Sequence, residues 1–113
     1  MRVYRVENWS GRGPYNGKGC YKAGYDTACS DRHPMPYSDG IPYWDDTDRF
    51  GFKTKKALQK WFNKKMRRDL AKHKYRISIF EVPKENVVLG RKQLVFKRRR
   101  AKRVKKLDLI ECE

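Results

Sequence analysis

The residue types that could carry acid–base or metal chemistry gather around one histidine. His33 follows Asp31, and three more acids, Asp45, Asp46 and Asp48, lie a short distance further along the chain. Carboxylate oxygens bind hard cations and an imidazole can activate water, so this combination would suit a metal-dependent nuclease. Acids beside Pro and Gly are also ordinary turn residues, whose carboxylates bond nearby backbone N–H groups. We favour the turn interpretation, assign no metal or cofactor, and take His33 as the catalytic candidate to test first.

Three cysteines offer a second possible metal chemistry. Cys20 and Cys29 precede His33, and Cys112 stands near the end of the chain. Zinc binds thiolates and imidazoles, but this spacing matches no standard zinc motif and contains no Cys-x-x-Cys pair. We therefore expect free thiols in a reducing compartment. The N-terminus lacks the apolar segment of a secretory signal, and no stretch could cross a membrane, so we expect a cytoplasmic protein with no membrane partner.

Positive charge is concentrated in the second half of the chain. Residues 1–50 carry 7 Lys/Arg and 7 Asp/Glu, whereas residues 51–113 carry 22 Lys/Arg and 6 Asp/Glu, which accounts for the whole net charge of +16. Such a surplus raises the energy of the compact state through self-repulsion, and the usual reason to keep it is a polyanionic partner. The cations predicted to contact nucleic acid are Lys56, Lys60, Lys64, Arg67, Arg68, Arg98, Arg99, Arg100, Lys102 and Arg103.

The chemistry expected of these cations is neutralisation of the phosphate backbone. Lys and Arg side chains that pair with phosphates release counterions, and binding is then steeply salt-dependent. The sequence contains no helix-turn-helix, zinc-finger or RNP pattern, so base-specific recognition is not indicated. Two other interpretations stay open: the charge is a solvated face, or it docks on an acidic protein.

The first half of the chain predicts one strand and a long irregular segment. Residues 2–8 are rich in β-formers and predict a short strand. Residues 9–49 combine Gly and Pro with many Tyr, which is turn chemistry but too aromatic for a flexible linker. We expect this segment to be held in place by its rings, with room for one short strand or helical turn.

The second half predicts one amphipathic helix followed by strands. The helix spans residues 54–73 and opens at Thr54. Strands are predicted at 75–82 and 93–96, joined by a connection with a short apolar run. The basic segment 97–106 permits a short helix, and residues 107–110 could form a final strand. The whole chain, 1–113, is therefore predicted to be a single α+β domain with an antiparallel or mixed sheet. The residues that recur every four positions in the helix are Leu58, Phe62, Met66 and Leu70.

Short stretches spread over nearly the whole chain carry a resemblance to a known group of proteins. They are VYRVE at 3–7, GPY at 13–15, RHPMPYSDG at 32–40, FGF at 50–52, LQKWF at 58–62, ISIFEVP at 77–83 and GRKQLVF at 90–96. Together they resemble small accessory proteins of tailed bacteriophages, most of which have no assigned function. The resemblance implies a host-directed protein in the infected bacterial cytoplasm, which binds nucleic acid or a host nucleoprotein and so inhibits or redirects a host process.

A fainter likeness is to the ADP-ribosyltransferase fold. That fold often opens with a strand carrying Arg or His, here Arg5, and reaches its catalytic acid on a late strand. The comparable late position holds Gln93, which cannot supply the charge that stabilises an oxocarbenium-like centre. The resemblance therefore implies nucleotide binding without efficient transfer, unless Glu81 substitutes. An enzyme of this kind, a metal-dependent nuclease and a protein-directed inhibitor are the alternatives to nucleic-acid binding.

Overall fold

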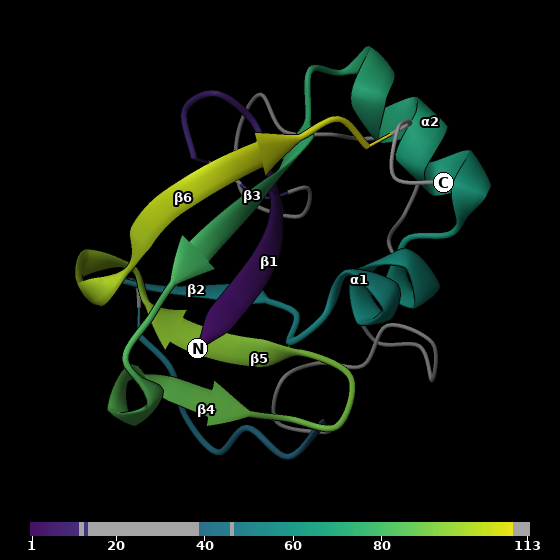
Figure 1. The fold of residues 1–113 in the computed structure, drawn as a ribbon. Coiled ribbons are helices and arrows are strands. Elements are labelled where there is room, and N and C mark those ends of the chain that lie inside the picture. The colour runs from purple at the N-terminus through teal and green to yellow at the C-terminus, as the bar shows by residue number, and fades with distance from the viewer. Residues whose placement is uncertain (12, 14–38, 46, 110–113) are drawn as a thin grey trace.

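Two three-stranded antiparallel sheets form the framework of the computed structural model, which describes residues 1–11, 13, 39–45 and 47–109 (Figure 1). Sheet A has the strand order β1-β3-β6, from β1 (Arg2–Glu7), β3 (Arg76–Glu81) and β6 (Lys102–Leu107). Sheet B has the order β2-β5-β4, from β2 (Asp48–Gly51), β5 (Leu94–Lys97) and β4 (Val87–Leu89). The predicted α+β class is confirmed, as are the strands predicted at 2–8, 75–82 and 93–96. Strand β4 forms where only a connection was expected.

The two sheets are joined where β1 meets the end of β2. Tyr4 and Phe52 exchange two backbone hydrogen bonds, of 2.8 Å and 2.7 Å, as an isolated antiparallel bridge. Gly51 makes this approach possible, because a Cβ on that residue would lie 2.7 Å from Val3 Cγ1 and 3.0 Å from the Tyr4 carbonyl oxygen. The bridge fixes sheet B against one part of sheet A.

Sheet A is covered differently on its two faces. Val6, Ile77 and Ile79 point to the face that packs against the helices, in a cluster with buried aromatic and aliphatic side chains. Val3 and Phe80 point to the other face and pack against Leu94, Phe96 and Val82 in a second cluster. This alternation follows from the two-residue period of a strand. Sheet B therefore covers the Val3 and Phe80 end of sheet A.

The predicted helix over 54–73 is wrong in one respect, because the segment forms two helices. They are α1 (Lys55–Trp61) and α2 (Lys64–Lys72). Thr54 begins α1 as predicted, with its hydroxyl accepting from Ala57 N at 3.0 Å. Asn63 then caps α2, since its side-chain oxygen accepts from Met66 N at 2.9 Å in an extended backbone conformation. Asn is among the best N-cap residues and a poor interior one, so it ends one helix and begins the next.

The basic segment 97–106 is not helical. Residues 98–100 form a single 3-10 turn, η3 (Arg98–Arg100), and the segment then continues as strand β6. A second 3-10 turn, η2 (Lys84–Asn86), precedes β4. The spacing of apolar residues that permitted a helix is only weakly periodic. Backbone pairing with the buried strand β3 outweighs this weak helical preference. The final strand is therefore the basic segment itself, and it ends at Leu107 where the separate strand was expected to begin.

The irregular segment 9–49 is described only at its two ends. The turn after β1 is in place, and residues 39–45 run along the β4–β5 hairpin before β2 begins at Asp48. Asp31, His33, Cys20, Cys29 and Cys112 lie outside the described residues, as does Asp46. Within the described part of the chain, no helix has the length and apolar character needed to cross a bilayer.

Candidate nucleic-acid interface

The longest exposed run of cations lies on β6, at an edge of sheet A. Residues 102–106 are all exposed, and β6 pairs with β3 on one side while no other described strand pairs with its outer edge. Lys105 lies opposite Ile79 and Arg103 opposite Phe80, so Val104 forms a bulge. Bulges increase the twist of a strand and re-aim its side chains. Strand β6 therefore carries exposed cations on both faces of sheet A. They are Lys102, Arg103, Lys105 and Lys106.

The η3 turn adds three arginines at the start of β6. The guanidinium carbon of Arg98 lies 4.5 Å from the centroid of the Phe80 ring, a cation–π contact that holds the turn against sheet A. Arg99 and Arg100 are exposed. The turn and the strand thus form one continuous basic surface, which we call the β6 surface. It comprises Arg98, Arg99, Arg100, Lys102, Arg103, Lys105 and Lys106.

Five of these seven residues belong to the set predicted from the sequence. Lys105 and Lys106 were left out of that set, although the cation-rich stretch from residue 97 to residue 106, interrupted only by Ala101 and Val104, was a signal that would have included them. The structure explains why they belong, because residues 102–106 of this edge strand are all exposed, on both faces of sheet A.

The carboxylates that the structure describes do little to offset this surface. In the described residues, no carboxylate forms an ion pair with a cation of β6. Lys97, at the end of β5, is the residue of the tail that does pair, with its Nζ 2.9 Å from Asp48 Oδ1 and 3.5 Å from Asp45 Oδ2. These carboxylates, with hydrogen bonding to Asp48 as the main cause, raise the pKa of Lys97.

The helix cations lie apart from the η3 end of the β6 surface. Lys56 and Lys60 on α1 and Lys64 and Arg68 on α2 are exposed, as expected. In Figure 1 the η3 turn lies at the far left and the two helices at the right, with sheet A between them. The structure therefore separates the helix cations from the η3 turn, while strand β6 runs from η3 toward the α2 side of sheet A.

Arg67 differs from the other nominated cations because it is only 7% exposed. Its Nη1 donates to the carbonyl oxygens of Phe62, at 2.6 Å, and Gln59, at 3.0 Å. These carbonyls lie at the end of α1, where a helix leaves its acceptors without intrahelical partners. Arg67 thus joins the two helices across the Asn63 break, which is a structural role.

Arg5, one of the catalytic candidates, is also engaged inside the fold. It is 5% exposed and its Nε donates to Glu7 Oε2 at 3.0 Å. Its two other nitrogens donate to the carbonyl oxygens of Phe50 at 2.8 Å and Gly11 at 3.2 Å. Burial is the largest influence on this guanidinium and lowers its pKa, while Glu7 acts in the opposite direction. The group ties together β1, β2 and the turn after β1.

The three residues of the ADP-ribosyltransferase likeness do not meet. Glu81 pairs across the sheet with Arg2, and its Oε1 accepts from Arg2 Nε at 2.9 Å. The register of β1 and β3 puts Glu81 on the helix face of sheet A and Arg5 on the opposite face. Gln93 lies in the β4–β5 connection, where its backbone N–H donates to Asp39 Oδ2 at 2.9 Å.

Of the acids predicted as turn residues, Asp45 and Asp48 form a local turn. Asp45 Oδ1 accepts from Thr47 N at 2.8 Å and Thr47 Oγ1 at 2.6 Å, and these hydrogen bonds lower the pKa of Asp45 to about 2. Asp39 is buried, and it accepts from the backbone N–H groups of Lys92 and Gln93. Among the described residues there is no group of three His, Cys, Asp or Glu side chains arranged to hold a metal. The proposed nuclease pair of His33 and Asp31 lies outside those residues.

The fold and its charge define a small α+β protein with an exposed basic edge strand. Over residues 1–110 the chain matches the family model described as Bacteriophage T4 Y00F protein. The chain belongs to this bacteriophage family, which confirms the resemblance to phage accessory proteins. Comparison with curated proteins found no match, and neither did comparison with solved structures. The likeness to ADP-ribosyltransferases is not touched by these comparisons and stays a prediction.

Proposed function

We propose that this phage protein binds nucleic acid through the β6 surface, in the cytoplasm of the infected host, and so inhibits or redirects a host process. The observation that carries the proposal is an edge strand with four exposed cations and no ion-paired carboxylate in the described residues. Six residues at about 3.3 Å each give β6 a length of about 20 Å. One strand of a DNA duplex carries about six phosphates over that distance.

The simpler explanation of these cations is protection of the sheet edge. Lysines on an edge strand discourage pairing with another chain, and natural proteins use them for that purpose. Protection of the edge does not account for the three arginines of η3, because they lie in a 3-10 turn before the strand and not on its edge. The continuity of η3 with β6 favours a surface for a polyanion.

The test is a salt titration with two matched variants. The first replaces Lys102, Arg103 and Lys105 with Gln, and the second replaces Lys56, Lys60 and Lys64 with Gln, so that both lose three charges. Binding of a labelled DNA duplex is measured by fluorescence anisotropy over a range of salt concentrations. We expect the first triple variant to reduce the log–log salt slope by up to about 2.7, which is about 0.9 per lost phosphate contact. The second should change it much less.

Three outcomes would contradict the proposal. Absence of binding by the wild type at low salt, both to the duplex and to a labelled single strand, would remove nucleic acid as the ligand. Equal losses in the two triple variants would show that net charge, and not the β6 surface, governs binding. A partner that is retained from a nuclease-treated host lysate, and that the first triple variant loses, would instead identify an acidic host protein or nucleoprotein as the ligand.

A further inference from the structure

A pocket of about 380 Å³ lies at one end of sheet A. It is on the same face as Val3 and Phe80, which pack against sheet B at the other end. We propose that it binds one unpaired nucleotide, so that the protein prefers single-stranded nucleic acid to duplex. The inference rests on the proposed function and names its substrate class. The volume falls in the range of small-ligand sites. The lining residues come from β1, the turn after it, the connection before β3, β3 itself and β6: Glu7, Asn8, Trp9, Lys74, Arg76, Ser78 and Lys106.

The floor of the pocket is polar and buried. Ser78 is 2% exposed and Glu7 is 3% exposed, yet both line the pocket. In the sheet register Ser78 stands between Arg5 and Lys106, and Glu7 stands opposite Arg76. A hydroxyl donor and acceptor beside a carboxylate acceptor can recognise the polar edge of a base.

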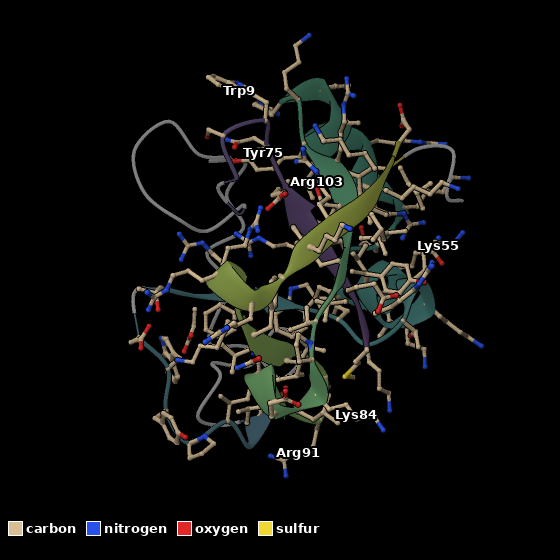
Figure 2. The ribbon with its side chains drawn as sticks, turned by 60° about the vertical axis from the view of Figure 1, so that its left-hand side comes forward. Trp9, Lys55, Tyr75, Lys84, Arg91 and Arg103 are labelled. Atoms are coloured by element: carbon tan, nitrogen blue, oxygen red, sulfur yellow. The ribbon has the colours of Figure 1, made fainter. Side chains whose placement is uncertain are left out.

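A rigid turn presents an indole at the rim. Trp9 is 86% exposed, which is unusual for the largest apolar side chain, and Figure 2 shows it projecting away from the ribbon. Asn8 Oδ1 accepts from Ser10 N and Ser10 Oγ, and the Gly11 N–H donates to the Asn8 carbonyl oxygen at 3.0 Å. Gly11 has a φ of +84°, a value that favours glycine. The turn is therefore fixed by its own hydrogen bonds, and it presents the Trp9 indole to solvent at the rim of the pocket.

Three cations also line the pocket. Arg76 and Lys106 lie on adjacent strands of sheet A, and Lys106 also belongs to the β6 surface. Lys74 has a φ of +70° at the end of α2, a conformation that usually belongs to glycine. A lysine at such a position costs backbone strain and contributes a charge to the pocket. A single strand of nucleic acid that binds along the β6 surface can therefore continue directly into the pocket.

A nucleotide uses all three features, and simpler ligands do not. An inorganic anion would pair with the cations and leave the indole in water. An acidic peptide would do the same and would not need the buried hydroxyl. A base offers a flat face to Trp9, polar edges to Ser78 and Glu7, and a phosphate to the cations. In a duplex the base faces are stacked and unavailable, so the pocket distinguishes strands that have unpaired bases.

The experiment compares a fluorescein-labelled single-stranded oligothymidylate with a DNA hairpin of equal phosphate count. We expect the wild type to bind the single strand more tightly at the same salt concentration. Trp9→Ala should weaken single-strand binding by about 5- to 150-fold, leave its salt slope unchanged and leave hairpin binding unchanged. Tyr43→Ala, which removes another strongly exposed ring outside the pocket, is the matched control and should bind as the wild type does. An oligouridylate arm shows whether RNA is bound equally.

A second variant separates binding from stability. Lys74→Gly removes one cation and relieves the left-handed backbone, so it should keep or raise the thermal midpoint while lowering the single-strand salt slope by about 0.7. Photocrosslinking to a 5-iodouridine strand should label the tryptic peptide of residues 6–12, which contains Trp9.

The outcomes distinguish the two proposals. If the wild type binds neither probe, the proposed function fails. If it binds both probes equally, and Trp9→Ala has no effect, the protein binds nucleic acid but the pocket inference is overturned. Equal losses in Trp9→Ala and Tyr43→Ala would likewise overturn it, because stacking would then be unspecific.

Discussion

The buried Arg5–Glu7 pair permits a sharp test of whether Arg5 is structural. Arg5→Met keeps much of the side-chain length but removes the charge and every N–H of the guanidinium. It leaves Glu7 buried without its cation, and it takes away the hydrogen bonds to the carbonyl oxygens of Phe50 and Gly11. If Arg5 acted in catalysis, its loss would instead leave the fold largely intact.

The magnitude follows from the burial of both partners. Removing one member of a buried ion pair costs about 3–5 kcal/mol, because the remaining charge is uncompensated. A domain of this size has a free energy of unfolding of about 5–15 kcal/mol, so the variant should keep only part of its stability. At about 2 kcal/mol per M of urea, a loss of 4 kcal/mol moves the unfolding midpoint down by about 2 M.

The assay is urea unfolding followed by circular dichroism, with a double variant as control. Replacing both partners, in Arg5→Met/Glu7→Leu, removes the unpaired carboxylate and should be less destabilising than Arg5→Met alone. The difference between the double variant and the sum of the single ones should exceed about 1 kcal/mol, as for residues in direct contact. A cost of less than 1 kcal/mol for Arg5→Met, or strictly additive losses, would refute this account of the pair.

Three further predictions concern stability. Gly90→Ala should cost about 1–3 kcal/mol in urea unfolding, because its Cβ would lie 2.6 Å from Asp39 Oδ2; a neutral effect would mean that the hairpin shifts freely. Lys64→Glu should stabilise α2 by about 0.3–1 kcal/mol, because the first turn holds no acid; an unchanged thermal midpoint at low salt would contradict this. The folded-state pKa of Asp45 lies below its ordinary value of 3.8, so its charge stabilises the fold above about pH 4, and this contribution is lost as the pH falls toward 2. The stability difference between wild type and Asp45→Asn should therefore shrink over that interval in acid unfolding, and a constant difference would refute the assignment.

Regular elements were predictable wherever a periodic pattern coincided with a buried face. Strand β3 and the apolar positions Leu58 and Leu70 follow directly from such patterns. The break between the two helices could not be predicted in this way. The four-residue spacing of apolar side chains continues across Asn63, and only the capping hydrogen bond of Asn63 marks the boundary. Strand β6 was missed because cations have low strand propensity, and its conformation depends on pairing with β3.

The candidate site was predictable in charge but not in arrangement. The excess of cations predicted the kind of ligand, yet the sequence could not say how the helix and tail cations lie relative to one another, and the fold puts η3 far from the helices. Arg67 was nominated by its spacing, whereas its contacts depend on the neighbouring end of α1. The pocket joins residues from positions 7 to 106, and no local pattern could have grouped them.

The exposed edge of β6 has a consequence for how copies of the protein meet one another. Two free strand edges that approach in dilute salt repel each other through their lysines and arginines, and this repulsion keeps the copies apart. Polyanion binding, concentrated salt or neutralising substitutions all weaken that repulsion and expose the backbone N–H and C=O groups of the edge to a second copy. Solubility and ligand binding therefore depend on the same four side chains of β6. A loss of charge there should increase self-association as well as lower the affinity for a polyanion.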